Sequence, residues 1–511
     1  MTSEAQALQR LAQPAWRLAN LYCIVDKAGQ VVRFAPNAAQ RAFLARMHER
    51  NIILKARQLG FSTLACILWL DTALFAREPL ACCIIAQDRV TAQYLFGKVR
   101  FAYERLPQAL RAQFPLSRQT AEEMAFAHNG ASVRVATSAR GGTIHRLHVS
   151  EMGKIGAKYP EKAREIVTGS IPAVPMHGVA IVESTAEGDS GRFYEMVRAA
   201  EEAQAAGRAL SPRDWRLHFF PWHGAEEYRL PADAVHLTAE DVQYFAEVEQ
   251  RCGVQLAPEQ KAWYVATLRG ADMAGERPLM WQEYPSFAEE PFKTPQEGCY
   301  WARQLLQARA EGRVCPTLPV ESGVAVDSFW DIGANDNTAI WLMQRVGAEC
   351  RFIRHYKASG EPLAHYTQWL QQQGVTFGRH WLPHDAGYHR LGEAGNASVQ
   401  EMLERLMPGQ RFEVLPRTPS VLAGIEAARQ ALAVCWFDES QCAAGLRDLA
   451  AYRKAWDERR GTWKDAPFHG EESDSADAFR QFAQARAAGL LAPARAVRHV
   501  VRRRGVSPMA V

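Results

Sequence analysis

The chain has 511 residues, of which 48% are hydrophobic and 23% are charged. This length and usage exclude a disordered or fibrous protein and, at roughly 150 residues per domain, predict about three globular domains. The net charge of +4, from 60 basic and 56 acidic residues, neither favours nor excludes a nucleic-acid partner, which would need local basic patches.

The chain carries no sign of export or of a membrane anchor. Its ten cysteines form no CxxC pair and no cluster with zinc-ligand spacing, so we expect buried, reduced thiols. Residues 1–16 lack the basic and apolar regions of a signal peptide, and the longest apolar stretch, 64–76, contains Asp71 and is too short to cross a bilayer. These features predict a soluble intracellular protein with no membrane partner.

The first half of the chain alternates short apolar runs with amphipathic segments. Strands are expected at 51–55, 80–86, 132–137, 146–150 and 178–184, and helices at 62–76 and 91–106. Strands that alternate with helices predict a parallel α/β sheet, in which ligands bind at the carboxyl ends of the strands. Residues 224–318 are instead helix-rich and charged, and they predict a lid or linker.

A second α/β pattern begins near Gly323. Strands are expected at 324–330, 338–344 and 350–356, followed by a helix at 362–373, a strand at 379–383, helices at 398–406 and 420–433, and helices from there to the end. Three antiparallel strands followed by alternating elements is the order of an RNase H-like sheet. The last residues, 490–511, hold five arginines and no acid, and they predict a flexible tail.

The segment from Lys55 to Thr63, KARQLGFST, follows a strand and opens a helix. A phosphate loop belongs at such a place, because backbone N–H groups and the helix N-terminus face an anion. The standard pattern has lysine where this chain has phenylalanine, so Lys55 or Arg57 has to supply the positive charge. Gly60 lies within the loop. Ser62 or Thr63 can hold Mg²⁺. An ordinary strand–turn–helix connection is the alternative interpretation.

Two later strands also end in polar residues. RLHVSE places Glu151 where phosphate-loop ATPases have a pair of acids; Ser150 replaces the first acid, and Glu151 remains as the candidate base. IVESTAEG ends in Ser184 and Thr185, whose hydroxyls can sense a γ-phosphate. Taken alone, Glu151 can be a solvated loop residue, but the three segments in this order predict a site for ATP and Mg²⁺.

With these segments the chain resembles, over nearly its whole length, the large terminase subunit of tailed bacteriophages, the ATP-driven motor that packages DNA. KARQLGFST resembles that family's variant Walker A loop, which implies that Lys55 is the phosphate lysine and that Ser62 lies on the Mg²⁺ side. LHVSE resembles its Walker B segment, and ESTAEG resembles its coupling motif. PNAAQ resembles its adenine-reading segment, with Gln40 as the reader, and Arg140 in SARGGT stands where the family has an arginine finger that acts across subunits.

Carboxylates in the second half suit a two-metal nuclease, which needs acids that converge on Mg²⁺ or Mn²⁺ ions about 4 Å apart. In an RNase H-like sheet these ligands come from the first strand, a later strand and a late helix, as Asp331, Asp385 and Asp477 do. Taken singly, each can be a turn residue or a helix cap. The resemblance implies that Asp477 is a metal ligand. Asp474 is an auxiliary ligand, because the family commonly has histidine where this chain has Asp474. Asp336 is at most a minor contributor.

The resemblance also implies an organisation and a set of partners. Residues 1–223 would form an ASCE-type P-loop ATPase core, 224–318 its helical lid or linker, 319–489 an RNase H-like nuclease and 490–511 a basic flexible tail. The partners would be double-stranded DNA, the portal ring of the procapsid, a small terminase subunit and further copies in a ring, all in the host bacterial cytoplasm.

Basic residues near the predicted last helices are candidates for contact with DNA phosphates. They lie on and after a helix expected to hold Tyr452 and Trp456, and a solvated helix face is the alternative. They are Arg447, Arg453, Lys454, Arg459, Arg460 and Lys464. Two rival functions stay open, a nuclease–ATPase of DNA repair unrelated to capsids and a prophage remnant that binds DNA through dead sites.

Overall fold

The computed structural model describes residues 3–189, 191–293, 297–333, 337–388, 390–392 and 395–491. It divides into two compact units, with the boundary between Glu297 and Gly298. The basic tail predicted at 490–511 lies outside the described residues from position 492 onward. Within the described ranges, no helix is both long enough and apolar enough to cross a membrane.

The first unit is built on an eight-stranded sheet with the order β10-β3-β9-β8-β4-β7-β6-β5. The strands from β10 to β7 are parallel, and β6 and β5 add an antiparallel edge. Their bounds are β3 (Arg50–Lys55), β4 (Ala81–Ile85), β5 (Leu116–Gln119), β6 (Glu123–Phe126), β7 (Ser132–Ala136), β8 (Arg146–Ser150), β9 (Val179–Ser184) and β10 (Arg216–Phe220). The predicted parallel α/β sheet is confirmed.

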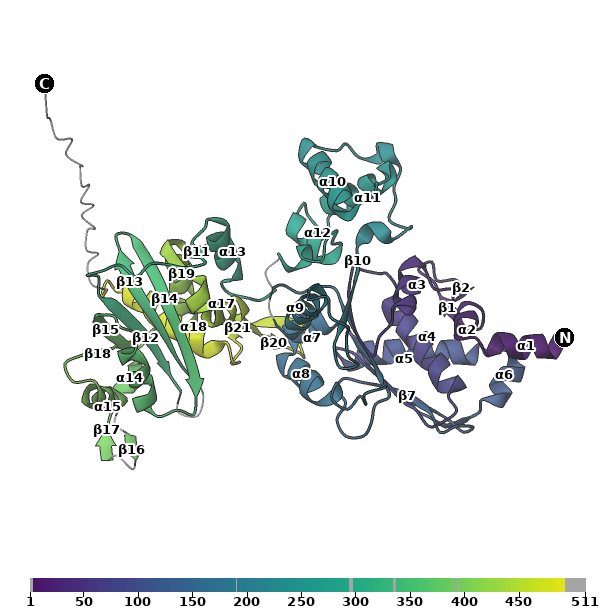
Figure 1. The fold of residues 1–511 in the computed structure, drawn as a ribbon, viewed down its shortest axis with the longest axis horizontal. Helices are drawn as coiled ribbons and strands as arrows, with labels where there is room; N and C mark the ends of the chain where they lie inside the picture. The colour runs from purple at the N-terminus through teal and green to yellow at the C-terminus, as the bar shows by residue number, and fades with distance from the viewer. Residues whose placement is uncertain are drawn as a thin grey trace, which may run out of the picture. The chain divides into compact units, whose positions relative to one another are not determined.

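Helices cover both faces of this sheet, and a small hairpin of β1 and β2 stands beside it (Figure 1). The bounds are α1 (Ser3–Leu11), α2 (Pro14–Asn20), β1 (Cys23–Val25), β2 (Val31–Arg33), α3 (Ala38–Ala45), α4 (Phe61–Phe75), α5 (Arg89–Glu104), α6 (Gln108–Gln113), α7 (Met152–Lys158), α8 (Pro160–Glu165) and α9 (Gly191–Ala205). The helices predicted at 62–76 and 91–106 are therefore present as α4 and α5.

Alternate residues of β3 point to opposite faces of the sheet, because side chains of a strand alternate with a period of two. Ile53 packs in the same core cluster as Leu64 of α4. Ile52 and Leu54 pack in a second cluster, which also holds Ile155 of α7. The sheet thus separates a face covered by α4 from a face covered by α7, and this division fixes which polar side chains can meet.

Three helices follow the sheet and form one group, coloured teal in Figure 1: α10 (Ala239–Cys252), α11 (Pro258–Arg269) and α12 (Arg277–Glu283). Their starts follow ordinary rules: Thr238 caps α10 by accepting from the backbone of Asp241, and Pro258 stands in the first turn of α11. Their core is aromatic, with Phe245 and Tyr264 buried. The region is helix-rich, as the sequence predicts.

The second unit holds a seven-stranded sheet with the order β11-β19-β14-β13-β12-β15-β18. β12, β13 and β14 form an antiparallel meander, β15 lies parallel to β12, and β18 lies parallel to β15. The bounds are β11 (Val314–Cys315), β12 (Val326–Ile332), β13 (Asn337–Val346), β14 (Glu349–Ser359), β15 (Phe377–Leu382), β18 (Arg411–Val414) and β19 (Cys435–Asp438). The three strands predicted in succession, and the fourth after them, are confirmed.

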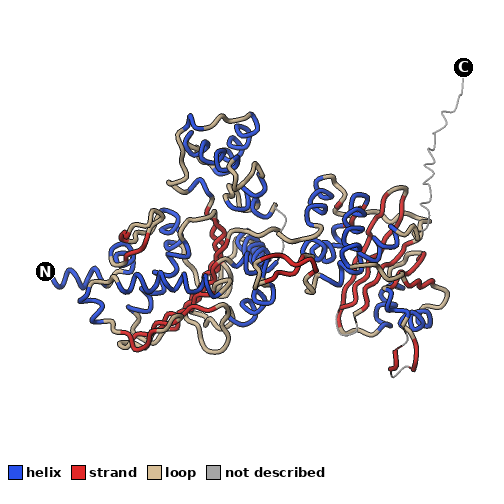
Figure 2. Tube along the Cα trace, turned by 180° about the vertical axis from the view of Figure 1, so that it is seen from behind, coloured by secondary structure: helices blue, strands red, loops and turns tan. Residues whose placement is uncertain are grey.

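Helices, blue in Figure 2, lie beside this sheet. They are α13 (Ala302–Ala310), α14 (Leu363–Gln371), α15 (Val399–Leu406), α16 (Val421–Ala431), α17 (Glu439–Ala451) and α18 (Ser473–Ala487). The expectation of helices alone after residue 433 is wrong, because β19 and a hairpin of β20 (Lys454–Asp457) and β21 (Thr462–Pro467) stand among them. These strands are too short for their hydrophobic periodicity to distinguish them from helices.

The boundary between the units falls earlier than the one predicted at 318. Trp301 and Leu305 are buried in the core of the second unit. β11 pairs in parallel with β19 of the same unit. The predicted segment 224–318 is therefore divided, because its last part supplies apolar side chains and a strand to the second sheet.

Candidate active sites

The loop that joins β3 to α4 holds two residues with a left-handed backbone. Gly60 has a left-handed backbone with φ of 76°, and Gln58 has a φ of 59°. Such angles favour glycine and are strained for glutamine, and strain of this kind gathers at functional sites. α4 begins at Phe61, directly after the loop, so its N-terminal N–H groups can face a bound phosphate.

Lys55, at the end of β3, lies between two acids. Its Nζ is 3.3 Å from Glu151 Oε1 and 3.0 Å from Glu183 Oε2. Burial would lower the pKa of Lys55, but the two carboxylates outweigh it and raise that pKa above its ordinary value. The lysine is therefore held in its charged form at the point where the resemblance places the phosphate lysine.

Glu151 follows β8 and precedes α7 in a left-handed conformation, with φ of 57°. A non-glycine residue in this region costs about 1–2 kcal/mol, which the surrounding structure must offset. Its side chain is half-buried and faces Lys55, and Lys154 Nζ lies 3.7 Å from its second oxygen. The structure thus places this acid beside the loop and not in a solvated turn.

Ser184 and Thr185 follow Glu183 at the end of β9. Ser184 Oγ accepts from the Gly153 N–H at 3.0 Å, which ties β9 to the first turn of α7. A Cβ on Gly153 would lie 2.8 Å from the Thr185 carbonyl oxygen, so only glycine fits this contact. The Thr185 hydroxyl is buried and has no hydrogen-bond partner among the described residues, which leaves a donor for a ligand.

Ser62 and Thr63, in the first turn of α4, face different partners. Ser62 Oγ donates to Glu183 Oε1 at 2.5 Å. Thr63 Oγ1 accepts from Lys98 Nζ of α5 at 2.9 Å. Sequence reasoning did not identify Lys98 or Glu183. Glu183 could have been noticed as a charged residue inside an apolar strand. Lys98 lies on a helix of apolar and polar residues, and no sequence feature distinguishes it.

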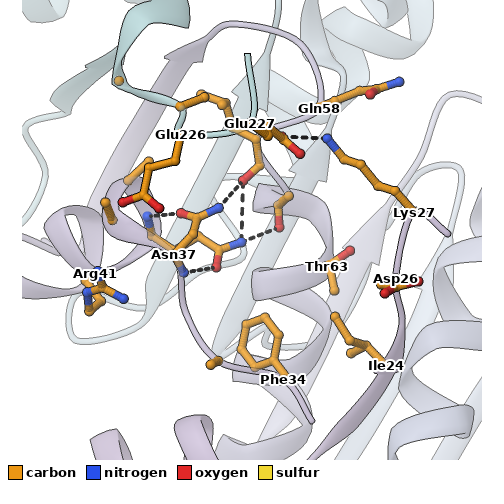
Figure 3. Close-up of a pocket in the computed structure, with 18 of the residues that line it drawn as sticks. Ile24, Asp26, Lys27, Phe34, Asn37, Arg41, Gln58, Thr63, Glu226 and Glu227 are labelled. Carbon is orange, nitrogen blue, oxygen red and sulfur yellow. Dashed lines mark hydrogen bonds and ion pairs between the residues drawn. The ribbon is translucent and has the colours of Figure 1, made fainter. Parts of the chain in front are cut away.

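A cavity of about 650 Å³ opens beside the loop, lined by residues of β1, α3, the loop and the segment after β10 (Figure 3). Ligand pockets commonly have volumes of about 300–1,000 Å³, so this one can take a nucleotide base and sugar. Gln40 lines it, is itself buried, and donates from Nε2 to the Gly60 carbonyl at 2.9 Å. Asn37 caps α3 and donates to the Leu59 carbonyl at 3.1 Å, so the predicted adenine segment is fixed against the phosphate loop.

The two arginines predicted at this site differ in their surroundings. Arg57 lies in the loop, and its Nη1 is 3.4 Å from Glu283 Oε2 of α12, so it joins the loop to the helical group. Its carbonyl accepts a hydrogen bond from Tyr228. Arg140 lies in the segment after β7, is exposed, and pairs with Glu165 at 3.0 Å. An exposed arginine fits a role toward a neighbouring subunit, and that role stays a prediction.

The second unit brings the predicted acids to one edge of its sheet. β12 and β15 are parallel, so Asp331 near the end of β12 and Asp385 just after β15 lie at the same edge. Asp477 of α18 joins them, and all three line a cavity of about 590 Å³. Asp474 does not line it; its Oδ2 accepts from Asn337 Nδ2 at 2.8 Å. Asp336 lies outside the described residues.

Like charges lie in and near this cavity. Burial and then Asp477, Asp474 and Asp385 raise the pKa of Asp331 well above its ordinary value, while Arg480 lowers it. Arg480 Nη2 lies 2.6 Å from Asp477 Oδ1 and also lines the cavity. Carboxylates that repel one another in a buried place favour a bound cation, and their oxygens suit Mg²⁺ or Mn²⁺.

The described part of the chain nevertheless holds no group of three or more acid, histidine or cysteine side chains close enough to bind a metal ion as they stand. The four aspartates lie close enough to affect one another electrostatically, but they are not arranged to coordinate a metal ion. Their role as metal ligands therefore stays a prediction, and Arg480 is the cation that sequence reasoning did not single out.

The basic residues predicted to contact DNA do not share a helix. α17 ends at Ala451, and the residues from Lys454 to Lys464 lie on the hairpin of β20 and β21. Arg453 is buried, with Nη2 4.0 Å from Glu472 and its guanidinium over the Phe468 ring. The helix therefore ends before Tyr452 and Trp456, contrary to the expectation, and Arg453 is taken up inside the second unit.

No protein-family profile matches this chain, and no curated protein matches it. Among solved structures, the large terminase of bacteriophage HK97 is similar over 93% of this chain and 99% of its own, at 12% identity and a TM-score of 0.44. The large terminase of a thermophilic bacteriophage, solved with ATP-γ-S, is similar over 85% of this chain and 93% of its own, at 12% identity and a TM-score of 0.28. The P22 large terminase nuclease domain is similar over 35% of this chain and 89% of its own, at 17% identity and a TM-score of 0.27. The solved proteins named here, to which this chain is similar, are thus all large terminases of phages.

Proposed function

We propose that this chain is a large terminase subunit, which hydrolyses ATP to move double-stranded DNA into a procapsid and cuts concatemeric DNA with a two-metal nuclease. The observation that supports the ATPase most directly is that Lys55 pairs with Glu151, and through Glu183 with Ser62, beside a phosphate-type loop and a cavity of nucleotide size. These groups come from β3, the end of β8, β9 and the start of α4, which is where a parallel sheet binds its ligand.

Each residue then has a role in the proposed reaction. ATP with Mg²⁺, when bound, supplies the phosphoanhydride and the metal that neutralises its charge. Lys55 would hold the phosphates, and Glu151 would accept a proton from the attacking water. Arg140 would complete the site of a neighbouring copy, and Ser184, through the Gly153 N–H, would connect the state of β9 to α7.

The second unit would cut DNA. Asp331, Asp385 and Asp477 would hold Mg²⁺ or Mn²⁺, with Asp474 beside them, and the metals would polarise the scissile phosphate. The mutual repulsion of these carboxylates supports this interpretation, because a divalent cation relieves it. The proposed partners are double-stranded DNA, the portal ring, a small terminase subunit and further copies of the chain, in the host bacterial cytoplasm.

Paired variants test the two activities in one purified protein. We expect Glu151→Gln to lose DNA-stimulated ATP hydrolysis by about a hundredfold or more and to keep metal-dependent plasmid cleavage. Asp385→Asn should lose cleavage and keep ATP hydrolysis. The matched controls are Glu161→Gln, an exposed acid on α8, and Asp465→Asn, whose side chain is 85% exposed on the hairpin.

Either activity is measured with Mg²⁺ or Mn²⁺ beside EDTA. Normal ATP turnover by the Glu151→Gln protein would refute the assignment of the base. Equal plasmid cleavage by the Asp385→Asn protein would refute the nuclease site. A folded wild-type chain with neither activity, tested with DNA and a portal ring, would favour the binding remnant over the motor.

A further inference from the structure

A serine stands at the end of β8 where the pattern of phosphate-loop ATPases calls for an acid. Ser150 and Glu183 are directly paired across the parallel strands β8 and β9, and Glu183 is paired with Ile53 on the other side, in β3. Residues paired in this way point to the same face of a sheet. Ile53 and Ile181, two residues before Glu183, both pack in the cluster that contains α4. Glu183 therefore points toward the N-terminus of α4.

Glu183 is fully buried; its Oε1 accepts hydrogen bonds and its Oε2 forms an ion pair. Oε1 accepts from Ser62 Oγ at 2.5 Å and from Ser150 Oγ at 3.0 Å. Oε2 lies 3.0 Å from Lys55 Nζ, and His148 Nε2 is 3.4 Å from Oε1. Burial raises the pKa of Glu183, but Lys55, His148 and Ser62 outweigh it and keep that pKa below its ordinary value.

The partners of this carboxylate distinguish it from an ordinary core ion pair. Burial of a charge is costly unless the charge is paired and hydrogen-bonded, so a core position would favour a neutral residue. Glu183 instead contacts the lysine before the phosphate loop and the hydroxyl after it, the two side chains that bracket the loop. It also shares Lys55 with Glu151, the proposed base.

We propose that Glu183 and Ser150 together replace the acid missing from β8, with Glu183 as the positioning residue that aligns Ser62 and Lys55 for a nucleoside triphosphate bound with Mg²⁺. In this arrangement the carboxylate lies on the neighbouring strand β9, and its Oε1 accepts from Ser62 Oγ at 2.5 Å. Ser150 fills the space that the usual aspartate would occupy and donates to the relocated carboxylate. This inference rests on the proposed ATPase and adds to it a residue that the motifs did not single out.

Binding of a fluorescent ATP analogue, with excess Mg²⁺ and with EDTA, tests the proposal without relying on hydrolysis. In the wild-type protein Mg²⁺ should tighten binding. In Glu183→Gln we expect this gain to fall by about tenfold or more, because a charge-assisted hydrogen bond to Ser62 is lost. Ser150→Asp added to Glu183→Gln should restore the gain, whereas Ser150→Asn, of the same shape without the charge, should not.

The outcomes distinguish the role of Glu183 from the ATPase proposal. A Glu183→Gln protein with the Mg²⁺ dependence of the wild type would overturn this inference and leave the ATPase proposal intact. A loss that Ser150→Asp and Ser150→Asn repair equally, or not at all, would reduce Glu183 to a packing role. A wild-type chain that binds no nucleotide with Mg²⁺ would overturn the ATPase proposal and this inference with it.

A folding defect in Glu183→Gln does not end the test. The swapped protein Ser150→Asp/Glu183→Ser keeps one carboxylate on this face of the sheet, near Lys55. We expect it to fold, as judged by its thermal melt, and to bind the analogue with the Mg²⁺ dependence of the wild type. A folded swapped protein that lacks this dependence would overturn the proposal.

Discussion

Asp71 is the one charged residue of α4, and its carboxylate lies inside the first unit. Arg17 of α2 donates to both of its oxygens at 2.8 Å, and Tyr22 Oη donates to one of them at 2.7 Å. The sequence shows Asp71 only as an interruption of an apolar stretch. Its partner Arg17 is 54 positions away and becomes apparent only when α2 packs on α4.

Removing this carboxylate leaves Arg17 buried without a counter-charge. We expect Asp71→Asn to lower the free energy of unfolding of the first unit by about 3–5 kcal/mol. The control is Glu122→Gln, which removes one partner of the exposed pair with Arg89 and should cost about 1 kcal/mol or less. Urea unfolding followed by tryptophan fluorescence measures both; equal losses would contradict the assignment of Asp71 to a buried network.

Among the elements, the segment that follows α12 carries a buried acid, Glu290, which packs against α10. Glu290 accepts from Tyr244 Oη at 3.0 Å and from the Ser286 N–H at 2.5 Å. Burial raises its pKa from 4.5 to about 7, although these hydrogen bonds and Lys293 act the other way. The folded state therefore binds a proton that the unfolded state has already released between these two pH values.

The sign of the pH dependence follows from this difference. The stabilising contribution of neutral Glu290 is full below pH 4.5 and is lost as the pH rises through about 7. The total loss is on the order of 3 kcal/mol. We expect the melting temperature of the first unit to fall between pH 5 and pH 8 more steeply in the wild type than in Glu290→Gln. Glu247→Gln, an exposed acid on α10, should keep the wild-type slope; parallel curves for all three would refute the prediction.

The whole molecule has two compact units, and the core clusters on either side of position 298 share no residue. Unfolding of such a chain need not be a single two-state transition. We expect guanidinium unfolding to show two transitions, with Asp71→Asn shifting only the one that belongs to the first unit.

A glycine in the second unit gives the complementary variant. A Cβ on Gly445 of α17 would lie 2.4 Å from the Trp341 ring, so Gly445→Ala should cost about 1–3 kcal/mol and shift only the other transition. Gly424→Ala in α16 is the control: its Cβ meets Arg480 at an ordinary 3.6 Å, and it should be neutral or stabilise slightly. One transition, shifted alike by Asp71→Asn and Gly445→Ala, would show a single cooperative unit instead.

Strands and motifs that have a local pattern can be predicted from the sequence. Contacts that depend on the order of strands in a sheet cannot. The strands β3, β4, β7, β8 and β9 of the first unit were recoverable because each is a short apolar run between turn signals, whereas β5, β6 and β10 were not predicted. The lysine at the end of β3 and the acid after β8 could be identified from motifs. Glu183 could not, because its meeting with both depends on β9 lying between β3 and β8. β19 and the unit boundary likewise depend on pairing across the second sheet, whereas β20 and β21 pair only with each other.

The shared lysine of the first unit has a consequence for the order of events. Lys55 pairs with Glu151 in the structure and so holds that carboxylate beside the loop. An incoming phosphate carries more negative charge and would pair with the same ammonium, so its arrival must loosen the hold on Glu151. Occupancy of the loop and release of the acid are thus thermodynamically linked, each favouring the other by the same free energy. In the proposed ATPase, Glu151 would therefore stay paired with Lys55 until a nucleotide binds.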